Sequence, residues 1–342
     1  MNEYSGKTVF VVEGENERDL FLSFLMNIFP EIGLNKENII VWGTNIYELY
    51  DLIEKEYDSD WYKNGLTVDI PFLVSKKKNN GNIIYSKDCN NIVLLFDYER
   101  QDPDFDQSKI EILQKHFNNI SEDGMLYINY PMIESYLDMS DIPDKEYFNK
   151  KVLASIHNGA SYKNQVNSIS QLKKIIQLYS CLQNEINKIL LEAGSDDWSI
   201  VLYNILTVND ERLIENTVQE QLTNYKVSPE KIKYLKHFIS AQLCRVLPHN
   251  KGVSFLEKMR ELFVCVIKQN LSKAWHIENN MVNETEKDYR YMFDDLTYID
   301  LLSNQGKISR DKNTGYIWVI CTALLFCLEY KIFWKYSDSI NI

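Results

Sequence analysis

The chain lacks the closely spaced cysteine and histidine pairs that hold zinc in most zinc proteins. Its six cysteines are far apart with no CxxC pair, and its five histidines form no HxxxH or HxxE pattern. These spacings disfavour a zinc site. Most of the cysteines lie in apolar surroundings, which is typical of buried, reduced thiols, so we expect a cytoplasmic protein.

Long apolar runs, glycine and proline are also scarce. The apolar stretch at residues 316–328 covers about 13 residues before Glu329 and Lys331, whereas a membrane-spanning helix needs about 18. We therefore expect a buried helix there and no membrane partner. With 12 Gly and 7 Pro in 342 residues, the composition favours a helix-rich chain, long enough for two domains. No phosphate-binding loop of the GxxxxGKS/T type is present.

Positive charge is scarce relative to negative charge in the first half of the chain. The formal net charge is −12, and residues 1–150 carry 28 Asp and Glu against 14 Lys and Arg. An acidic protein needs metal ions or a local basic surface before it can approach nucleic-acid phosphates. The charge therefore disfavours indiscriminate binding to nucleic acid, and it concentrates acidity in the N-terminal half.

The first 140 residues alternate between short apolar runs and amphipathic segments. The apolar runs predict strands buried on both faces, at residues 8–12, 38–42, 91–96 and 125–130. Apolar residues at helical spacing predict helices at residues 16–29, 46–57 and 109–118. Alternation of this kind predicts an α/β fold with a mainly parallel sheet flanked by helices.

After about residue 150 the apolar pattern becomes helical throughout. Helices are expected at residues 166–193, 198–207, 229–247, 253–275 and 316–336. We therefore expect an α/β domain over residues 1–145, with residues 58–90 as an insertion or loop. An all-helical domain over residues 150–342 would then serve substrate selection, dimerisation or partner docking.

Four acidic residues follow the predicted strands. They are Glu13, Asp97, Glu99 and Glu134. Because open α/β sheets bind their ligands at the carboxyl ends of the strands, we expect these side chains to converge there. Glu17 lies about one helical turn beyond Glu13 and could support the group. Crowded carboxylates repel one another, and their hard oxygens suit Mg²⁺ or Mn²⁺, so the sequence predicts a divalent metal site.

Each set of acids has a simpler explanation when it is taken alone. Acids at residues 13–17 are also typical of a first helical turn, where the helix dipole favours negative charge. The acidic segment at residues 97–106 is also typical of a solvated turn. Their occurrence together on a strand–helix framework favours the metal site.

The order of these motifs resembles that of a Toprim domain. That family has a strand ending in Glu-Gly, here Glu13-Gly14, and a later apolar strand ending in Asp-x-Asp. Here the second motif reads Asp97-Tyr98-Glu99, with Glu in place of the usual second Asp. The segment Ile133-Glu134-Ser135-Tyr136-Leu137 is similar to an Ile-Glu-Asn-Tyr-Leu-like stretch in OLD-like nucleases and in the AriB-like subunits of PARIS phage-defence systems. The resemblance covers about residues 5–140.

The resemblance implies a metal-dependent phosphodiesterase that cuts DNA or RNA, with tRNA among the candidate substrates. Glu13 would be a metal ligand or general base, Asp97 and Glu99 would bind Mg²⁺ or Mn²⁺, and Glu134 would complete the site. The defence systems also imply an antiviral effector that works with a regulatory ATPase.

The sequence alone leaves two other functions open. It also leaves open the role of one basic helix. One alternative function is another Mg²⁺-dependent phosphotransfer enzyme, and the other is a non-catalytic, acidic binding or sensor subunit. Lys231, Lys233 and Lys236 cluster near a predicted helix start with Tyr225 and Tyr234, which is typical of a nucleic-acid surface or of an ordinary helix exterior. Aromatic residues near the C-terminus predict either core packing or a homodimer surface.

Overall fold

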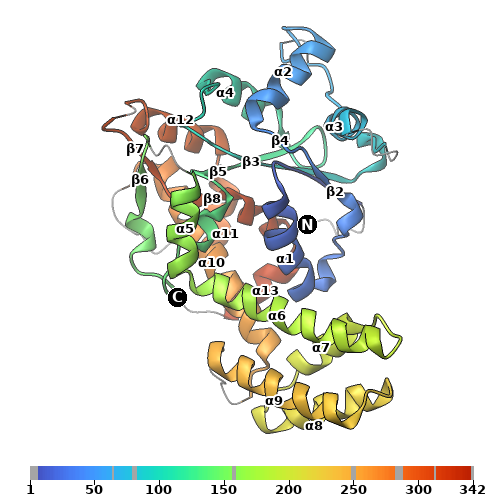
Figure 1. Cartoon of the computed structure of the whole chain (residues 1–342). Helices are drawn as coiled ribbons and strands as arrows, with labels where there is room; N and C mark the ends of the chain where they lie inside the picture. The colour runs from blue at the N-terminus through green and yellow to red at the C-terminus, as the bar shows by residue number, and fades with distance from the viewer. Residues whose placement is uncertain are drawn as a thin grey trace. The chain divides into compact units, whose positions relative to one another are not determined.

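The computed structural model of the protein describes residues 7–63, 65–78, 83–155, 159–247, 252–281, 288–311 and 313–339. The chain divides into two compact units, which are coloured along the sequence in Figure 1. The larger unit contains Met1–Ile169 and Cys265–Ile342, and the smaller unit contains Ser170–Val264. None of the helices within the described ranges is long and apolar enough to cross a bilayer.

The larger unit is built on a mixed, mostly parallel sheet. Its strands follow the order β2–β1–β3–β5–β4. Their bounds are β1 Thr8–Val12, β2 Ile39–Val41, β3 Asn91–Asp97, β4 Asn118–Asn119 and β5 Gly124–Tyr130. β1 is parallel to β2 and β3, β3 is parallel to β5, and β4 is antiparallel to β5. The predicted α/β class with a mainly parallel sheet is confirmed.

Helices cover both faces of this sheet, which explains the apolar strand sequences. Every residue of β1 and β3 is buried, as expected for strands that are covered on both sides. Figure 1 shows α2, α3 and α4 on one side of the sheet and α1 on the other. These helices span α1 Ser23–Ile28, α2 Ile46–Tyr57, α3 Ile70–Lys78 and α4 Gln107–His116. Residues 58–90, expected to be an insertion or loop, thus contain α3, which contacts β1 and β2.

The C-terminal segment returns to the same sheet. Residues 316–336, expected to be one helix, instead form β7 Tyr316–Trp318, β8 Ile320–Cys321, a 3₁₀ segment at Thr322–Glu329 and α13 Lys331–Ser339. β7 pairs with β6 (Lys151–Leu153), and β8 pairs antiparallel with β5. The expectation was wrong because periodicity does not distinguish a continuous apolar strand from a buried helix.

This return also corrects the expected domain division. We expected residues 150–342 to form one all-helical domain, but Cys265–Ile342 belongs to the larger unit. The reason is tertiary: the Ala323 N–H donates to the Asn129 side-chain oxygen at 3.1 Å, and the Thr322 hydroxyl donates to the Ile128 carbonyl at 2.7 Å. These bonds tie the C-terminal segment to β5, a partner that local sequence does not reveal.

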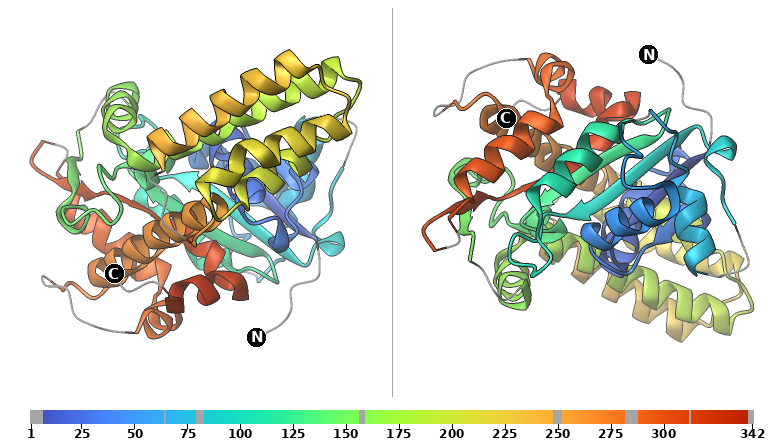
Figure 2. Two further views of the ribbon diagram at one scale, coloured as in Figure 1. Left: turned by 90° about the horizontal axis from the view of Figure 1, so that it is seen from below. Right: turned by 90° about the horizontal axis from the view of Figure 1, so that it is seen from above.

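The smaller unit is all helical. Its helices are α6 Gln171–Glu192, α7 Trp198–Leu206, α8 Glu211–Asn224 and α9 Pro229–Val246, and α10 (Phe255–Glu278) begins in it and continues into the larger unit. α6 to α9 lie side by side (Figure 2). The remaining helices belong to the larger unit and are α5 Gly159–Ile169, α11 Tyr289–Asp295 and α12 Tyr298–Ile308. The predicted helices at residues 198–207, 229–247 and 253–275 are confirmed with small changes of bounds.

Candidate functional site

Two parallel strand ends bring Glu13 and Asp97 together. Val12 in β1 lies opposite Leu95 in β3, so both strands end at the same edge of the sheet. The Glu13 N–H donates to the Leu95 carbonyl at 3.0 Å. The Glu13 Oε2 atom in turn accepts a hydrogen bond from the Asp97 N–H at 3.0 Å. The two acidic residues, 84 positions apart in the sequence, are therefore neighbours in space.

Glu17 turns back toward the same strand end. It begins a single π-helical turn (Glu17–Leu22), and its side chain is buried. Its Oε2 atom accepts a hydrogen bond from the Gly14 N–H at 3.0 Å. A Cβ atom on Gly14 would lie 3.2 Å from that oxygen, which explains the small residue at this turn.

Glu134 joins these acids from the segment that follows β5. It lies in a 3₁₀ segment (Ile133–Leu137) that directly follows the strand, and it is buried. Its Oε1 atom accepts a hydrogen bond from the Asn16 side-chain amide at 2.9 Å and lies 3.2 Å from the Lys163 Nζ atom. Its Oε2 atom is buried and has no hydrogen-bond partner in the described structure. A buried carboxylate oxygen without a protein partner is able to accept a hydrogen bond or to contact a cation.

Glu99 lies on the turn that follows β3, where the backbone changes direction. Its φ angle is +38°, a left-handed conformation that is uncommon outside glycine. The Glu99 N–H donates to the Pro131 carbonyl at 3.4 Å. Its half-buried side chain borders the same cavity as Glu13. The structure thus places all five predicted acidic residues at one edge of the sheet.

Burial and mutual repulsion raise the pKa values of these carboxyl groups. Burial is the largest cause of the raised pKa of Asp97, followed by the charges of the four other acids. Burial and the Glu99 charge raise the pKa of Glu13 well above its usual value. Burial, opposed in part by hydrogen bonds, raises the pKa of Glu17 from 4.5 to about 7. A site that disfavours the ionised forms in this way would favour a bound cation.

Lys163 supplies the positive charge that the sequence analysis missed. It lies on α5 and is partly exposed, and its charge lowers the pKa values of Glu13 and Glu17. Burial lowers the pKa of Lys163 itself, but the Glu134 carboxylate more than compensates, so the pKa is raised. Asn16 was missed as well. Neither residue belongs to a recognisable motif, so no local signal could have identified them.

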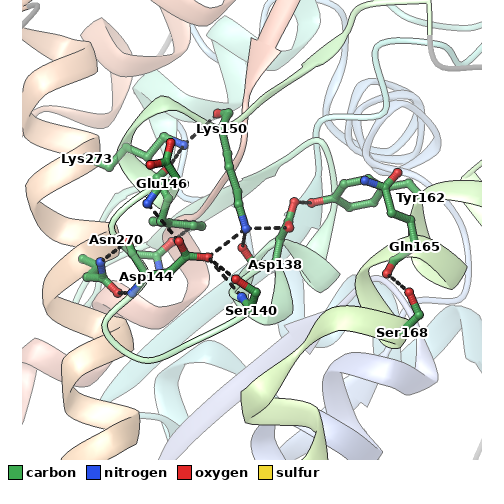
Figure 3. A network of polar contacts seen from close by, with 12 residues as sticks. Asp138, Ser140, Asp144, Glu146, Lys150, Tyr162, Gln165, Ser168, Asn270 and Lys273 are labelled. Atoms are coloured by element: carbon green, nitrogen blue, oxygen red, sulfur yellow. Dashed lines mark hydrogen bonds and ion pairs between the residues drawn. The ribbon is translucent and has the colours of Figure 1, made fainter.

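A buried polar network fixes the helix that carries Lys163 (Figure 3). The Tyr162 hydroxyl donates to the Asp138 Oδ2 atom at 3.1 Å. The Lys150 Nζ atom bridges Asp138 Oδ1 at 3.2 Å and Asp144 Oδ2 at 3.0 Å. Lys273, on α10, donates to the Lys150 carbonyl at 2.8 Å. α5 is thus anchored one residue before Lys163, with the anchor on the segment that follows Glu134.

The donor chemistry of the site fits a hard divalent cation. Every acidic ligand offers oxygen, and the buried Oε2 atom of Glu134 lacks a partner. Within the described ranges, however, no three acidic, Cys or His side chains are already grouped closely enough to hold an ion. Glu13 and Glu17 instead accept hydrogen bonds from backbone N–H groups. Metal binding would require these side chains to turn toward one another.

The basic cluster predicted on the helical part is largely engaged within its own unit. Lys231 forms an ion pair with Glu192, and Lys236 donates to the Gln219 side chain at 3.0 Å. Lys233 takes part in no ion pair among those found in the described ranges. This arrangement favours the ordinary helix exterior over a dedicated nucleic-acid surface.

If the acidic side chains turned toward one another, the arrangement would place a divalent cation next to Lys163, and a phosphate would then meet both charges. That combination suits reactions in which charge develops on phosphate oxygens. Comparisons of the chain with protein-family models, with curated proteins and with solved structures find no match.

Proposed function

We propose that this chain is a Mg²⁺- or Mn²⁺-dependent nuclease whose larger unit is Toprim-like. The observation that carries the proposal is the convergence of Glu13, Glu17, Asp97, Glu99 and Glu134 at the carboxyl edge of a parallel sheet. Ligand sites of open α/β sheets lie at this edge. The motif order that resembles Toprim domains supports the same reaction class.

Asp97, Glu99, Glu13 and Glu134 would hold the metal. When bound, a divalent ion supplies an activated water and neutralises charge on the phosphate. Glu17 would be the supporting acid, and its carboxylate accepts a hydrogen bond from the Gly14 N–H. The Lys163 side chain is partly exposed beside Glu134, and its ammonium group would contact a phosphate oxygen. The buried network at Tyr162 anchors the helix that carries this lysine.

The biological setting of the proposal comes from the resemblance to defence systems. It comprises a cytoplasmic antiviral effector, a nucleic-acid substrate such as tRNA, and a regulatory ATPase that controls cleavage. The smaller unit would provide substrate selection, homodimerisation or docking to that ATPase.

One observation favours a second candidate, a non-catalytic acidic binding subunit. In the described ranges no three metal-ligating side chains are preassembled, and Lys163 already offsets part of the negative charge. A subunit of this kind would bind a basic partner and would need no metal. Another Mg²⁺-dependent phosphotransfer enzyme would share the metal site but would act on a small phosphorylated substrate.

Cleavage assays with matched variants test these functions. We expect the wild type to cut labelled DNA or RNA, tRNA included, only with Mg²⁺ or Mn²⁺. Asp97→Asn should abolish cutting, whereas Asp104→Asn, which changes an exposed acid in the segment between β3 and α4, should leave it unchanged. Equal cleavage by the wild type and Asp97→Asn would reject the site. Failure of the wild type to bind Mn²⁺ would favour the acidic binding subunit.

A further inference from the structure

A large cavity opens directly beside the acidic group, which consists of Glu13, Glu17, Asp97, Glu99 and Glu134. It measures about 810 Å³, which is within the range of cavities that hold nucleotide-sized ligands. We call it the β2 pocket, because Ile39, Ile40 and Val41 of β2 form one wall. Glu13 and Glu99 line it as well, so it shares two residues with the proposed metal site.

The aliphatic wall of the β2 pocket is partly exposed because β2 is an edge strand. β2 ends the sheet order, so β1 is its sole partner strand in the described sheet, and its three residues are only half-buried. Ile84 adds another aliphatic side chain to the lining. Half-exposed aliphatic side chains at a polar cavity suit a flat ring such as a nucleobase.

One cation in this pocket is available for a ligand. Lys78 ends α3, and it takes part in no hydrogen bond or ion pair among those found in the described residues. Its Nζ atom lies so close to Gly43 that a Cβ atom there would be 2.8 Å away. Arg18, the other cation of the lining, is already paired with Glu15 and Asp19. Lys78 is therefore the lining cation that can take a phosphate.

The remaining charges decide which ligand fits. Five carboxylates and two cations line the pocket, so several phosphates at once would be repelled. Carboxylates do accept hydrogen bonds from base amino groups and sugar hydroxyls. Thr44 adds a shielded hydroxyl oxygen that lacks a partner in the described structure. The lining thus suits one nucleoside with a single phosphate rather than a duplex backbone.

We infer that the β2 pocket holds one unpaired nucleotide adjacent to the scissile phosphate. Its base would lie against Ile39, Val41 and Ile84, and its phosphate would contact Lys78. This inference rests on the proposed nuclease function, and it narrows the substrate to nucleic acid that is single-stranded at the cut. The pocket is the part of the site that would read the nucleotide, while the acidic group would hold the metal.

Binding measurements test the inference without depending on cleavage. The ligands are fluorescein-labelled single-stranded DNA, single-stranded RNA and duplexes of the same sequence, and anisotropy is recorded on the full chain carrying Asp97→Asn. We expect single strands to bind more tightly than duplexes, and the DNA and RNA arms identify the preferred sugar. Lys78→Ala should weaken single-strand binding about tenfold through loss of a charged hydrogen bond.

Two further variants make the outcome decisive. Lys76→Ala is the matched control, because Lys76 is an exposed lysine on the same helix that lines a different cavity. It should change single-strand binding less than twofold. Val41→Trp should block the pocket and weaken single-strand binding as Lys78→Ala does. Equal losses for Lys76→Ala and Lys78→Ala, or unchanged binding in Lys78→Ala and Val41→Trp, would overturn the inference.

The two proposals can fail separately. Metal-dependent cleavage that is insensitive to Lys78→Ala and Val41→Trp would leave the nuclease standing and remove the pocket assignment. Single-strand binding that both variants weaken, without cleavage under any metal condition, would keep the pocket as a nucleotide site and remove the nuclease. Equal binding of single strands and duplexes would also overturn the inference.

Discussion

The Lys163 ammonium group lies 3.2 Å from the Glu134 carboxylate, in an ion pair that joins α5 to the segment after β5. This lysine faces a group of buried acids whose pKa values are raised by burial and by one another. The positive charge of Lys163 thus offsets part of the repulsion among these carboxyl groups. Stability, metal binding and pH dependence should all respond to it.

Removal of this charge should destabilise the metal-free protein. We expect Lys163→Met to lower the free energy of unfolding by about 1 kcal/mol, a modest value because the lysine is partly exposed. Urea denaturation in EDTA measures the change, and Lys163→Arg is the control that keeps the charge. Saturating Mn²⁺ should recover much of the loss, and a Lys163→Met protein as stable as the wild type would contradict this role.

Stability of the metal-free protein should fall as the pH rises from about 5 to 8. The pKa of Glu17 is 4.5 when unperturbed and about 7 in the folded protein, so the native state binds more protons across this window. Stability then decreases with pH, by about 3 kcal/mol for a shift of this size. Glu17→Gln keeps the oxygen that accepts from Gly14 and should flatten the profile. An identical slope in this variant would exclude Glu17 as the source.

Divalent cations should stabilise the protein in a way that depends on Asp97. A ligand at 100 times its dissociation constant adds about 2.7 kcal/mol to the folded state. We expect the unfolding midpoint to rise with Mn²⁺ or Mg²⁺, and to rise more at pH 8 than at pH 5, because the carboxyl groups must lose protons to bind metal. Thermal unfolding of Asp97→Asn under the same conditions should show almost no metal response. A full response in that variant would place the ion elsewhere.

The network behind α5 should contribute measurably to stability. Tyr162→Phe removes the hydroxyl that donates to Asp138 at 3.1 Å in a buried position, at a cost of about 1–2 kcal/mol. Tyr203→Phe alters a more exposed tyrosine and should change the free energy of unfolding little. Chemical denaturation compares the two, and equal small effects would show that the Tyr162 hydrogen bond is dispensable.

Gly43 links the fold to the β2 pocket. Its φ angle is +85°, so Gly43→Ala should cost about 1–2 kcal/mol of stability. Gly33→Ala is the control, because Gly33 has a φ angle of +67° and nothing within 4 Å of its would-be Cβ atom. Both variants should lose similar stability, but only Gly43→Ala should displace Lys78 and weaken single-strand binding. Unchanged binding in Gly43→Ala would argue against Lys78 as the phosphate contact.

Local sequence was informative where structure depends on short-range patterns. The apolar run at residues 91–96 predicted β3 because a strand covered on both faces must be apolar at every position. The same reasoning failed for residues 316–336, whose apolar character is shared by strands and buried helices. There the pairing of β8 with β5 decided the outcome, and no periodicity reports a partner almost 200 residues away.

The sequence by itself determined the parallel strands and the acidic residues at their ends, because both follow from residues adjacent in the chain. Only the tertiary structure decided that Asn16 and Lys163 meet Glu134, that the C-terminal segment returns to the sheet, and that Lys78 faces a cavity beside Glu13. Each of these depends on packing between distant segments, and such contacts leave no repeating pattern along the chain. The balance between the acidic residues and Lys163 at the site therefore depends on tertiary contacts.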